Sequence, residues 1–168
     1  MYDVTATGEL LIDFTRNGLS EQNNRIYEAN PGGAPCNVLA MLGKLGYKTA
    51  FIGKVGDDEF GKLLKNTITE QKIDSTGLIL DPNAKTTLAF VDNDETGDRS
   101  FSFYRKPGAD MMLREDEVNY ELIDNCRIFH FGSLSMTDEP VRSATYAMVD
   151  YATVSYTHLR AHETELHL

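Results

Sequence analysis

The sequence predicts an α/β fold, in which a mostly parallel sheet carries helices on both faces. Apolar segments with strand character alternate along the chain with segments of helical periodicity, which is typical of sheets built from strand–helix units. The 168 residues are 41% hydrophobic and 25% charged, so the chain is long enough for one domain with a substantial core. We therefore expect one domain organised around a central sheet.

The charge balance limits the classes of partner. The formal net charge is −10, which argues against nucleic acid and anionic membranes as partners because both are also negatively charged. A nucleotide that binds together with a cation remains compatible with this charge, because a local site can oppose the charge of the whole chain.

No targeting or membrane-spanning segment is expected. The start of the chain lacks a basic segment followed by an apolar run, and no apolar stretch reaches the roughly 20 residues of a membrane span. Cys36 and Cys126 form neither a C-x-x-C pair nor a disulfide framework, so both are expected to be buried thiols. These features predict a cytoplasmic protein.

The first apolar segment ends in a candidate binding residue. Residues 3–14 are rich in Val, Thr, Leu and Ile and predict one strand that ends at Asp13. A carboxylate only accepts hydrogen bonds and can take them from two hydroxyl groups, so Asp13 could hold a hydroxyl-rich ligand. The alternative interpretation is a helix cap or a surface acid.

A glycine-rich turn comes next and predicts the start of a helix. Gly32 and Gly33 allow positive φ and close approach of a ligand, and Pro35 suits the first helical turn. The apolar residues that follow have helical spacing, and Gly46 predicts the end of the helix. Free N–H groups at this start, together with the Asn37 amide, could bind a neutral polyhydroxylated ligand. The alternative is an ordinary loop-to-helix turn.

The remaining segments continue the alternation. Residues 15–22 are polar and predict a loop. Apolar and β-branched runs predict strands at residues 25–30, 47–55, 76–80, 86–92, 99–105 and 127–132, with 86–92 and 99–105 paired as a hairpin. Apolar residues at helical spacing predict helices at residues 57–71, 116–125 and 139–151.

The acidic turn of this hairpin invites a calcium interpretation, which we do not favour. Asp92, Asp94 and Gly97 match the first, third and sixth positions of an EF-hand loop. Thr96 stands at the fifth position, and Phe103 stands at the twelfth, which requires Glu. A solvated turn is therefore expected, and we assign no metal site.

The motifs together resemble a known family. The run Gly-Gly-Ala-Pro-Cys-Asn-Val from Gly32 and the run Phe-Ile-Gly-Lys-Val-Gly-Asp-Asp-Glu-Phe-Gly at 51–61 resemble the first signature of the ribokinase-like (PfkB) carbohydrate kinases. The likeness is greatest to the fructokinase branch, and one position departs, since Leu39 stands where a small residue is usual. The resemblance implies a three-layer sandwich and a small β-lid over the sugar, built from about 25–30 and 86–105.

The resemblance also implies roles for individual residues. Residues 8–14 look like the opening of the family, where the aspartate at position 13 accepts hydrogen bonds from sugar hydroxyls. Residues 101–110 resemble the fructokinase strand that brings an aromatic ring and an arginine to the sugar. From the residues alone, the aromatic could be plain core and the arginine could form a surface ion pair. The substrate-binding set implied is Asp13, Gly32, Gly33, Asn37, Phe103 and Arg105.

The resemblance covers residues 1–152 and then stops. Residues 153–168 are interpreted as a tail foreign to the family, with three of the four histidines. The family's catalytic Gly-Ala-Gly-Asp segment, which supplies the general base and most of the nucleotide pocket, does not occur, nor does a Walker-type motif. We therefore expect an N-terminal part of the kinase domain that is itself inactive, with no catalytic residue and no assignable cofactor-binding residue.

The implied reaction is the ATP- and Mg²⁺-dependent phosphorylation of a sugar hydroxyl, most simply of fructose to fructose 6-phosphate. Within the family, the alternatives are kinases for ribose, 2-keto-3-deoxygluconate or a nucleoside. A different class, a sugar-binding module without catalysis, also fits the residues. The expected partners are a small sugar and a second copy of the chain that pairs through the lid.

Overall fold

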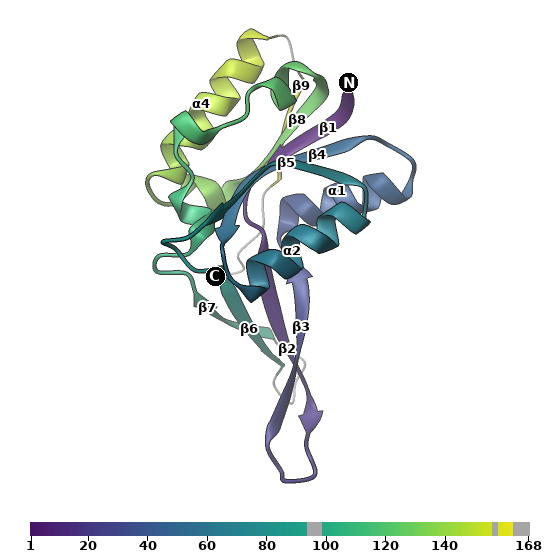
Figure 1. Cartoon of the computed structure of the whole chain (residues 1–168), viewed down its shortest axis with the longest axis vertical. Helices are drawn as coiled ribbons and strands as arrows, with labels where there is room; N and C mark the ends of the chain where they lie inside the picture. The colour runs from purple at the N-terminus through teal and green to yellow at the C-terminus, as the bar shows by residue number, and fades with distance from the viewer. Residues whose placement is uncertain (94–98, 156–157, 163–168) are drawn as a thin grey trace.

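The computed structural model describes the backbone of residues 1–93, 99–155 and 158–162 and shows a central sheet with a smaller sheet beside it (Figure 1). The central sheet has the strand order β5 (Ile73–Asp81), β4 (Thr49–Gly56), β1 (Tyr2–Thr7), β8 (Cys126–Gly132) and β9 (His158–His162). All four neighbouring pairs are parallel. The predicted α/β class with a mostly parallel sheet is confirmed.

Helices cover both faces of the central sheet. One face carries α1 (Ala34–Lys44) and α2 (Glu59–Glu70), and the other carries α3 (Glu121–Asp124) and α4 (Val141–Val154) (Figure 1). Short 3-10 turns connect them at η1 (Ala109–Met112), η2 (Glu115–Glu117) and η3 (Ser133–Met136). This is the three-layer arrangement that the resemblance implied.

The core has two apolar clusters, one on each face of the central sheet, and the side chains of β4 point alternately into them. Phe51 and Val55 lie in the apolar cluster beneath α1 and α2, whereas Ala50 and Ile52 lie in the cluster beneath α3 and α4. Successive side chains of a strand point to opposite faces, so one central strand supplies both cores. All four side chains are fully buried.

Both predicted helix starts on the first face are confirmed. Pro35 lies in the first turn of α1, and Gly46 lies just beyond the end of the helix with a positive φ of 90°. Asp58 precedes α2 and caps it by accepting a hydrogen bond of 2.9 Å from the Gly61 N–H. The Asp58 cap satisfies an amide that the first turn of α2 would otherwise leave unpaired.

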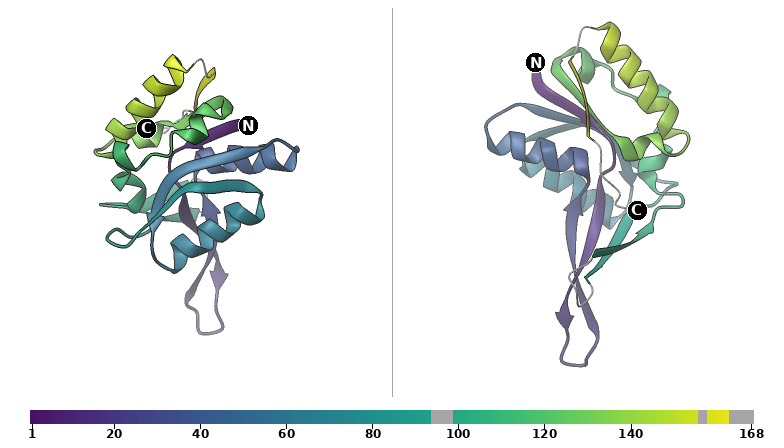
Figure 2. Two further views of the ribbon diagram at one scale, coloured as in Figure 1. Left: turned by 45° about the horizontal axis from the view of Figure 1, so that its top comes forward. Right: turned by 180° about the vertical axis from the view of Figure 1, so that it is seen from behind.

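The smaller sheet is the predicted lid, and it projects from the body of the molecule (Figures 1 and 2). Its strand order is β3 (Arg25–Gly32), β2 (Leu11–Leu19), β6 (Leu88–Asn93) and β7 (Arg99–Tyr104). The predicted strand at 25–30 and the antiparallel hairpin are confirmed. On one face, the rings of Phe14 and Phe90 stack with their centroids 5.0 Å apart.

The prediction of one strand over 3–14 is wrong. The chain leaves the central sheet after β1, turns at Gly8, and enters the lid as β2, which continues to Leu19 through residues predicted as a loop. Gly8 has a φ of 154°, and a Cβ atom there would lie 2.5 Å from Cγ of Pro35. Only glycine fits this crossing, which therefore separates two strands of different sheets.

The helix predicted at 116–125 is also largely wrong. Only α3 is α-helical there, since residues up to Glu117 belong to the 3-10 turn η2 and Val118 adopts an extended backbone. The predicted strand at 127–132 and helix at 139–151 are confirmed, although α4 extends to Val154.

Most of the acidic turn considered for calcium (94–98) lies outside the described residues. The boundary at residue 152 stays a prediction, and β9 within the tail pairs with β8.

A buried lysine ties β4 to the segment that follows the lid. Lys54 is 2% exposed, and its Nζ atom donates to both carboxylate oxygens of Glu117, at 2.7 and 2.6 Å, and to the Met112 carbonyl at 3.0 Å. Asp81 lies 3.5 Å from the same atom. The ammonium group is thus fully paired, as a buried charge must be.

Removing this ammonium group should destabilise the fold. We expect Lys54→Met to lower the free energy of unfolding by about 3 kcal/mol, because the partly buried carboxylates of Glu117 and Asp81 lose their partner. The control is Lys62→Met, which removes an exposed lysine 3.8 Å from Asp57 and should have little effect. Urea unfolding measures both variants, and equal stabilities would contradict a structural role for the buried ammonium.

Candidate functional site

The chain crosses between its two sheets four times, and the first two crossings lie together. It leaves the central sheet between β1 and β2, and it returns through Gly32 and Gly33 into α1. In the lid, Leu11 pairs with Gly32, and Asp13 pairs with Asn30 on the neighbouring strand. The predicted binding residues Asp13, Gly32 and Gly33 therefore gather where lid and central sheet meet.

Asp13 packs directly over Gly32. A Cβ atom at Gly32 would lie only 2.2 Å from Oδ2 of Asp13, so glycine is required for the carboxylate to occupy this place. Asp13 is half-buried, and burial raises the pKa of its carboxyl group. Within the described ranges, no hydrogen bond or ion pair engages this carboxylate, so its acceptor capacity is available to a ligand.

Gly33 begins α1 in a conformation that other residues rarely adopt. Its φ is 122°, and a Cβ atom there would lie 2.3 Å from the carbonyl oxygen of Glu9. The glycine pair thus allows the start of α1 to approach the first crossing closely. Asn37 lies one turn into the helix, where its backbone N–H donates to the Gly33 carbonyl at 3.0 Å.

Asn37 and Asp13 both lie next to Gly32. The Asn37 side chain is exposed and lines a cavity of about 50 Å³ between α1 and α2, together with Gly32 and Gln71. Asp13 does not line this cavity, although its carboxylate lies against Gly32. Both residues therefore lie next to Gly32, but only Asn37 lines this cavity.

Phe103 shares a lid face with Asp13. Asp13 of β2 pairs with Ala89 of β6, and Ala89 pairs with Phe103 of β7, so the three residues form a row across the strands. Strands are spaced about 4.8 Å apart, which places the backbone of Phe103 about 10 Å from that of Asp13. The Phe103 ring is half-exposed and stacks on Phe101 at 6.1 Å, so it is not plain core.

Arg105 is buried in an ion pair rather than on the surface. Its Nε atom donates to Oδ2 of Asp110 at 2.7 Å, and Oδ1 of Asp110 accepts a hydrogen bond from Thr87. Its Nη2 atom lies 3.5 Å from the carbonyl oxygen of Leu134 in η3, the turn that follows β8. Arg105 and Phe103 also line a common cavity of about 160 Å³, so the predicted aromatic–arginine pair is brought together.

Sequence reasoning missed Glu9. This residue follows Gly8 and is only 5% exposed, and its Oε1 atom accepts a hydrogen bond of 2.9 Å from the Ala34 N–H at the start of α1. Burial raises the pKa of Glu9. An acidic residue within an apolar run was the available signal, because a charge beside a buried strand needs a specific partner.

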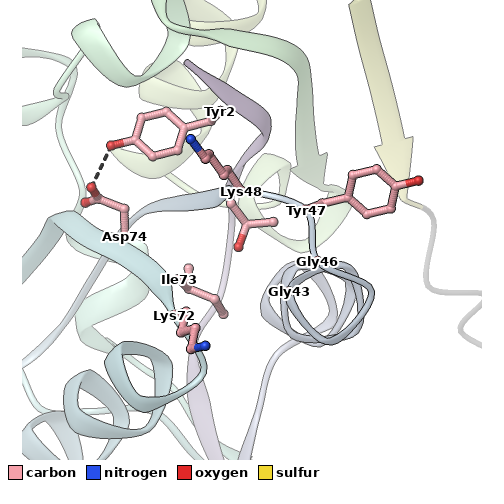
Figure 3. A pocket seen from close by; sticks show the side chains of 9 residues that line it. Tyr2, Gly43, Gly46, Tyr47, Lys48, Lys72, Ile73 and Asp74 are labelled. Carbon is pink, nitrogen blue, oxygen red and sulfur yellow. Dashed lines mark hydrogen bonds between the residues drawn. The ribbon is translucent and has the colours of Figure 1, made fainter.

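A different cavity lies at the opposite ends of the strands. It has a volume of about 500 Å³ and is lined by the first residues of β1, β4 and β5 and by neighbouring turns (Figure 3). There the Tyr2 hydroxyl donates to Asp74 at 2.6 Å, and this carboxylate raises the pKa of Tyr2 to about 12. None of the predicted binding residues lines this cavity.

The described residues offer no metal centre of their own. Across the described part of the chain, no group of three or more His, Cys, Asp and Glu side chains could hold a metal ion. We therefore derive no step through magnesium from these residues.

Among the described helices, none is both long and apolar enough to cross a membrane.

Comparison with known proteins agrees with this geometry. Residues 1–156 match the pfkB family carbohydrate kinases. A probable fructokinase-5 from Arabidopsis thaliana is 46% identical over 151 residues, which cover 89% of this chain and 47% of that protein. Fructokinase-2 from Zea mays is 45% identical over 146 residues, which cover 86% of this chain and 44% of that protein.

Solved structures show the same likeness. The crystal structure of fructokinase from Xylella fastidiosa has a TM-score of 0.90 at 33% identity and covers 96% of this chain and 50% of its own. A sugar kinase from Pyrococcus horikoshii in complex with ATP has a TM-score of 0.86 at 28% identity. The match covers 94% of this chain and 52% of that protein. The chain thus spans about half the length of these relatives. On the family match, the relatives and the shared fold, the chain belongs to the pfkB family of carbohydrate kinases.

Proposed function

We propose that the whole protein transfers the γ-phosphoryl group of ATP to a hydroxyl group of fructose, and that this chain contributes the sugar-binding part. One observation carries the proposal. The half-buried Asp13 carboxylate lies over Gly32 and is not engaged by any described residue. A hydroxyl-rich ligand is the natural donor to such a group, because its hydroxyls can satisfy both oxygens.

The surrounding residues fit the remaining parts of a sugar. Gly32 and Gly33 let the ligand approach the backbone at the start of α1, where Asn37 adds an amide with donor and acceptor atoms. Phe103 presents a half-exposed ring on the lid face that carries Asp13, and an aromatic face suits the apolar face of a sugar ring. Arg105 lies beside that ring and offers guanidinium donors.

The names of similar proteins favour fructose and ATP. The fructokinase from Xylella fastidiosa was solved with bound ATP, and that from Vibrio cholerae with fructose, ADP and calcium. We propose that magnesium is the ion used with ATP, because phosphoryl transfer requires a cation to neutralise the phosphate charge. Ribose, 2-keto-3-deoxygluconate or a nucleoside as the substrate and a non-catalytic sugar-binding module are the alternatives that a ligand panel separates.

The binding role of Asp13 can be measured on the chain itself. We expect Asp13→Ala to weaken fructose binding by about 10- to 100-fold, the loss expected for hydrogen bonds to a charged acceptor. The matched control is Asp74→Ala, which removes a partly buried carboxylate at the opposite ends of the strands and should leave fructose affinity unchanged. Calorimetric titration measures both, and equal affinities in all three chains would argue against a sugar site at Asp13.

The chain alone should not phosphorylate fructose. Proton removal from the attacking hydroxyl needs a positioned base, and charge on the transferring phosphoryl group needs donors. We expect both from the part of the relatives that this chain does not span. A coupled assay for ADP release, with Mg²⁺, ATP and fructose, should give no turnover by the purified chain. Fructose-dependent ADP release that survives repurification would contradict this expectation.

We also propose that two chains pair through their lids. The support is the exposed aromatic pair on β7, since Phe101 and Phe103 are each about half exposed and stacked on each other. Sedimentation equilibrium should show a dimer that Phe101→Asp weakens, because a buried unpaired charge is unfavourable. A monomer at all concentrations, with or without the substitution, would rule out this pairing.

A further inference from the structure

Glu9 holds a buried carboxyl group at the place where three elements converge. Its Oε1 atom accepts the Ala34 N–H at the start of α1. Its Oε2 atom is buried and has no hydrogen-bond partner within the described residues. A buried polar atom without a partner is costly, so its retention calls for a physical reason.

The backbone around Glu9 is shaped to admit this carboxyl group. A Cβ atom at Gly132, the last residue of β8, would lie 3.0 Å from Oε2 of Glu9 and 2.9 Å from Cγ of Pro35. Gly33 likewise has no room for a Cβ, because the Glu9 carbonyl oxygen is 2.3 Å from that position. The side chain is thus enclosed by the first crossing, the start of α1 and the end of β8.

Opposing charges surround this carboxyl group. Burial raises the pKa of Glu9, the Ala34 hydrogen bond and Arg105 lower it, and Asp110 raises it again. Arg105 after β7, Asp110 in η1 and Cys36 on α1 interact electrostatically with Glu9, and β8 carries a further buried titratable group, His130. Because burial is the largest influence, the neutral carboxyl is favoured relative to an exposed glutamate.

We propose that Glu9 is a positioning residue that fixes the glycine turn of the sugar site against the end of β8. It acts through the hydrogen bond to Ala34, which sets where Gly32 and Gly33 lie, and through its tight packing against Gly132. Glu9 itself does not touch the sugar, because its carboxyl group is buried beneath the turn. This inference rests on the proposed function for its effect on fructose, but the positioning can be measured without any sugar.

Two substitutions separate the roles of the carboxyl group. Glu9→Gln keeps the shape and an oxygen acceptor for the Ala34 N–H, and it resembles the neutral acid. Glu9→Ala removes the acceptor and leaves a space next to Gly132. Met148→Ala is the control for general destabilisation, because Met148 is a fully buried residue of α4 and lies in the other apolar cluster.

Hydrogen exchange and fructose titration test the positioning. In Glu9→Ala, we expect the Ala34 amide to exchange about tenfold faster and fructose affinity to fall about five- to tenfold, the range typical of losing a helix cap. Glu9→Gln should restore both values. Met148→Ala should lower the melting temperature but leave fructose affinity unchanged. Unaltered Ala34 exchange in Glu9→Ala would overturn the proposal, as would failure of the glutamine to rescue.

The pH dependence of stability gives an independent readout. The pKa of Glu9 is higher in the folded than in the unfolded chain. The stabilisation of the fold by Glu9 is therefore fully present below the unfolded-state pKa, and it is lost as pH rises through the folded-state pKa. Glu9→Gln cannot ionise, so its stability should match that of the parent chain near pH 4 and exceed it increasingly toward pH 7. A pH-independent difference would contradict this.

The outcomes distinguish this inference from the proposed function. If the parent chain binds no fructose, the proposed sugar site fails, while Ala34 exchange and the pH dependence still decide whether Glu9 positions the turn. If Glu9→Ala does not fold, the comparison of Glu9→Gln with the parent chain across pH gives the decision. Normal fructose binding with an unaffected Ala34 amide in the variants would leave the sugar site standing and remove Glu9 from it.

Discussion

The structure depends on two glycine-dependent crossings between the central sheet and the lid that must lie within contact distance of each other. Gly8 meets Pro35, and Gly33 meets the backbone of Glu9, at distances that exclude any Cβ atom. This constraint brings the carboxylate of Asp13 onto Gly32 and the start of α1 beneath the lid. The candidate binding site is therefore a consequence of how the chain changes sheets, and a larger residue at either crossing would separate its parts.

Much of the fold was predictable because it is encoded locally. The alternation of apolar segments, the proline in the first turn of α1 and the Asp58 cap of α2 each specify structure over a few residues. The break between β1 and β2 was not predictable from the apolar run, because only the distant Pro35 shows why Gly8 must turn. The prediction of a helix at 116–125 was wrong for a similar reason. Glu117 accepts a hydrogen bond from the distant Lys54, and Val118 is extended.

Some features of the candidate site were likewise predictable from the sequence, and others were not. The resemblance named Asp13, the glycine pair, Phe103 and Arg105 as one binding set, and the structure places Asp13 beside Gly32 and Phe103 beside Arg105. It could not show that Arg105 is held by Asp110, or that Glu9 is buried, because those facts depend on packing between segments far apart in sequence. Polar residues are placed by tertiary contacts, and periodicity carries little information about them.

The most direct test of a sugar site at the glycine turn is an NMR titration of the chain with fructose, which follows every backbone amide at once. The account predicts saturable shifts at Gly32, Gly33 and Asn37, with smaller shifts along the lid face that carries Asp13 and Phe103. Shifts centred instead on Tyr2, Lys48 and Asp74, which line the cavity at the opposite ends of the strands, would contradict the account. The absence of any saturable shift would contradict it equally.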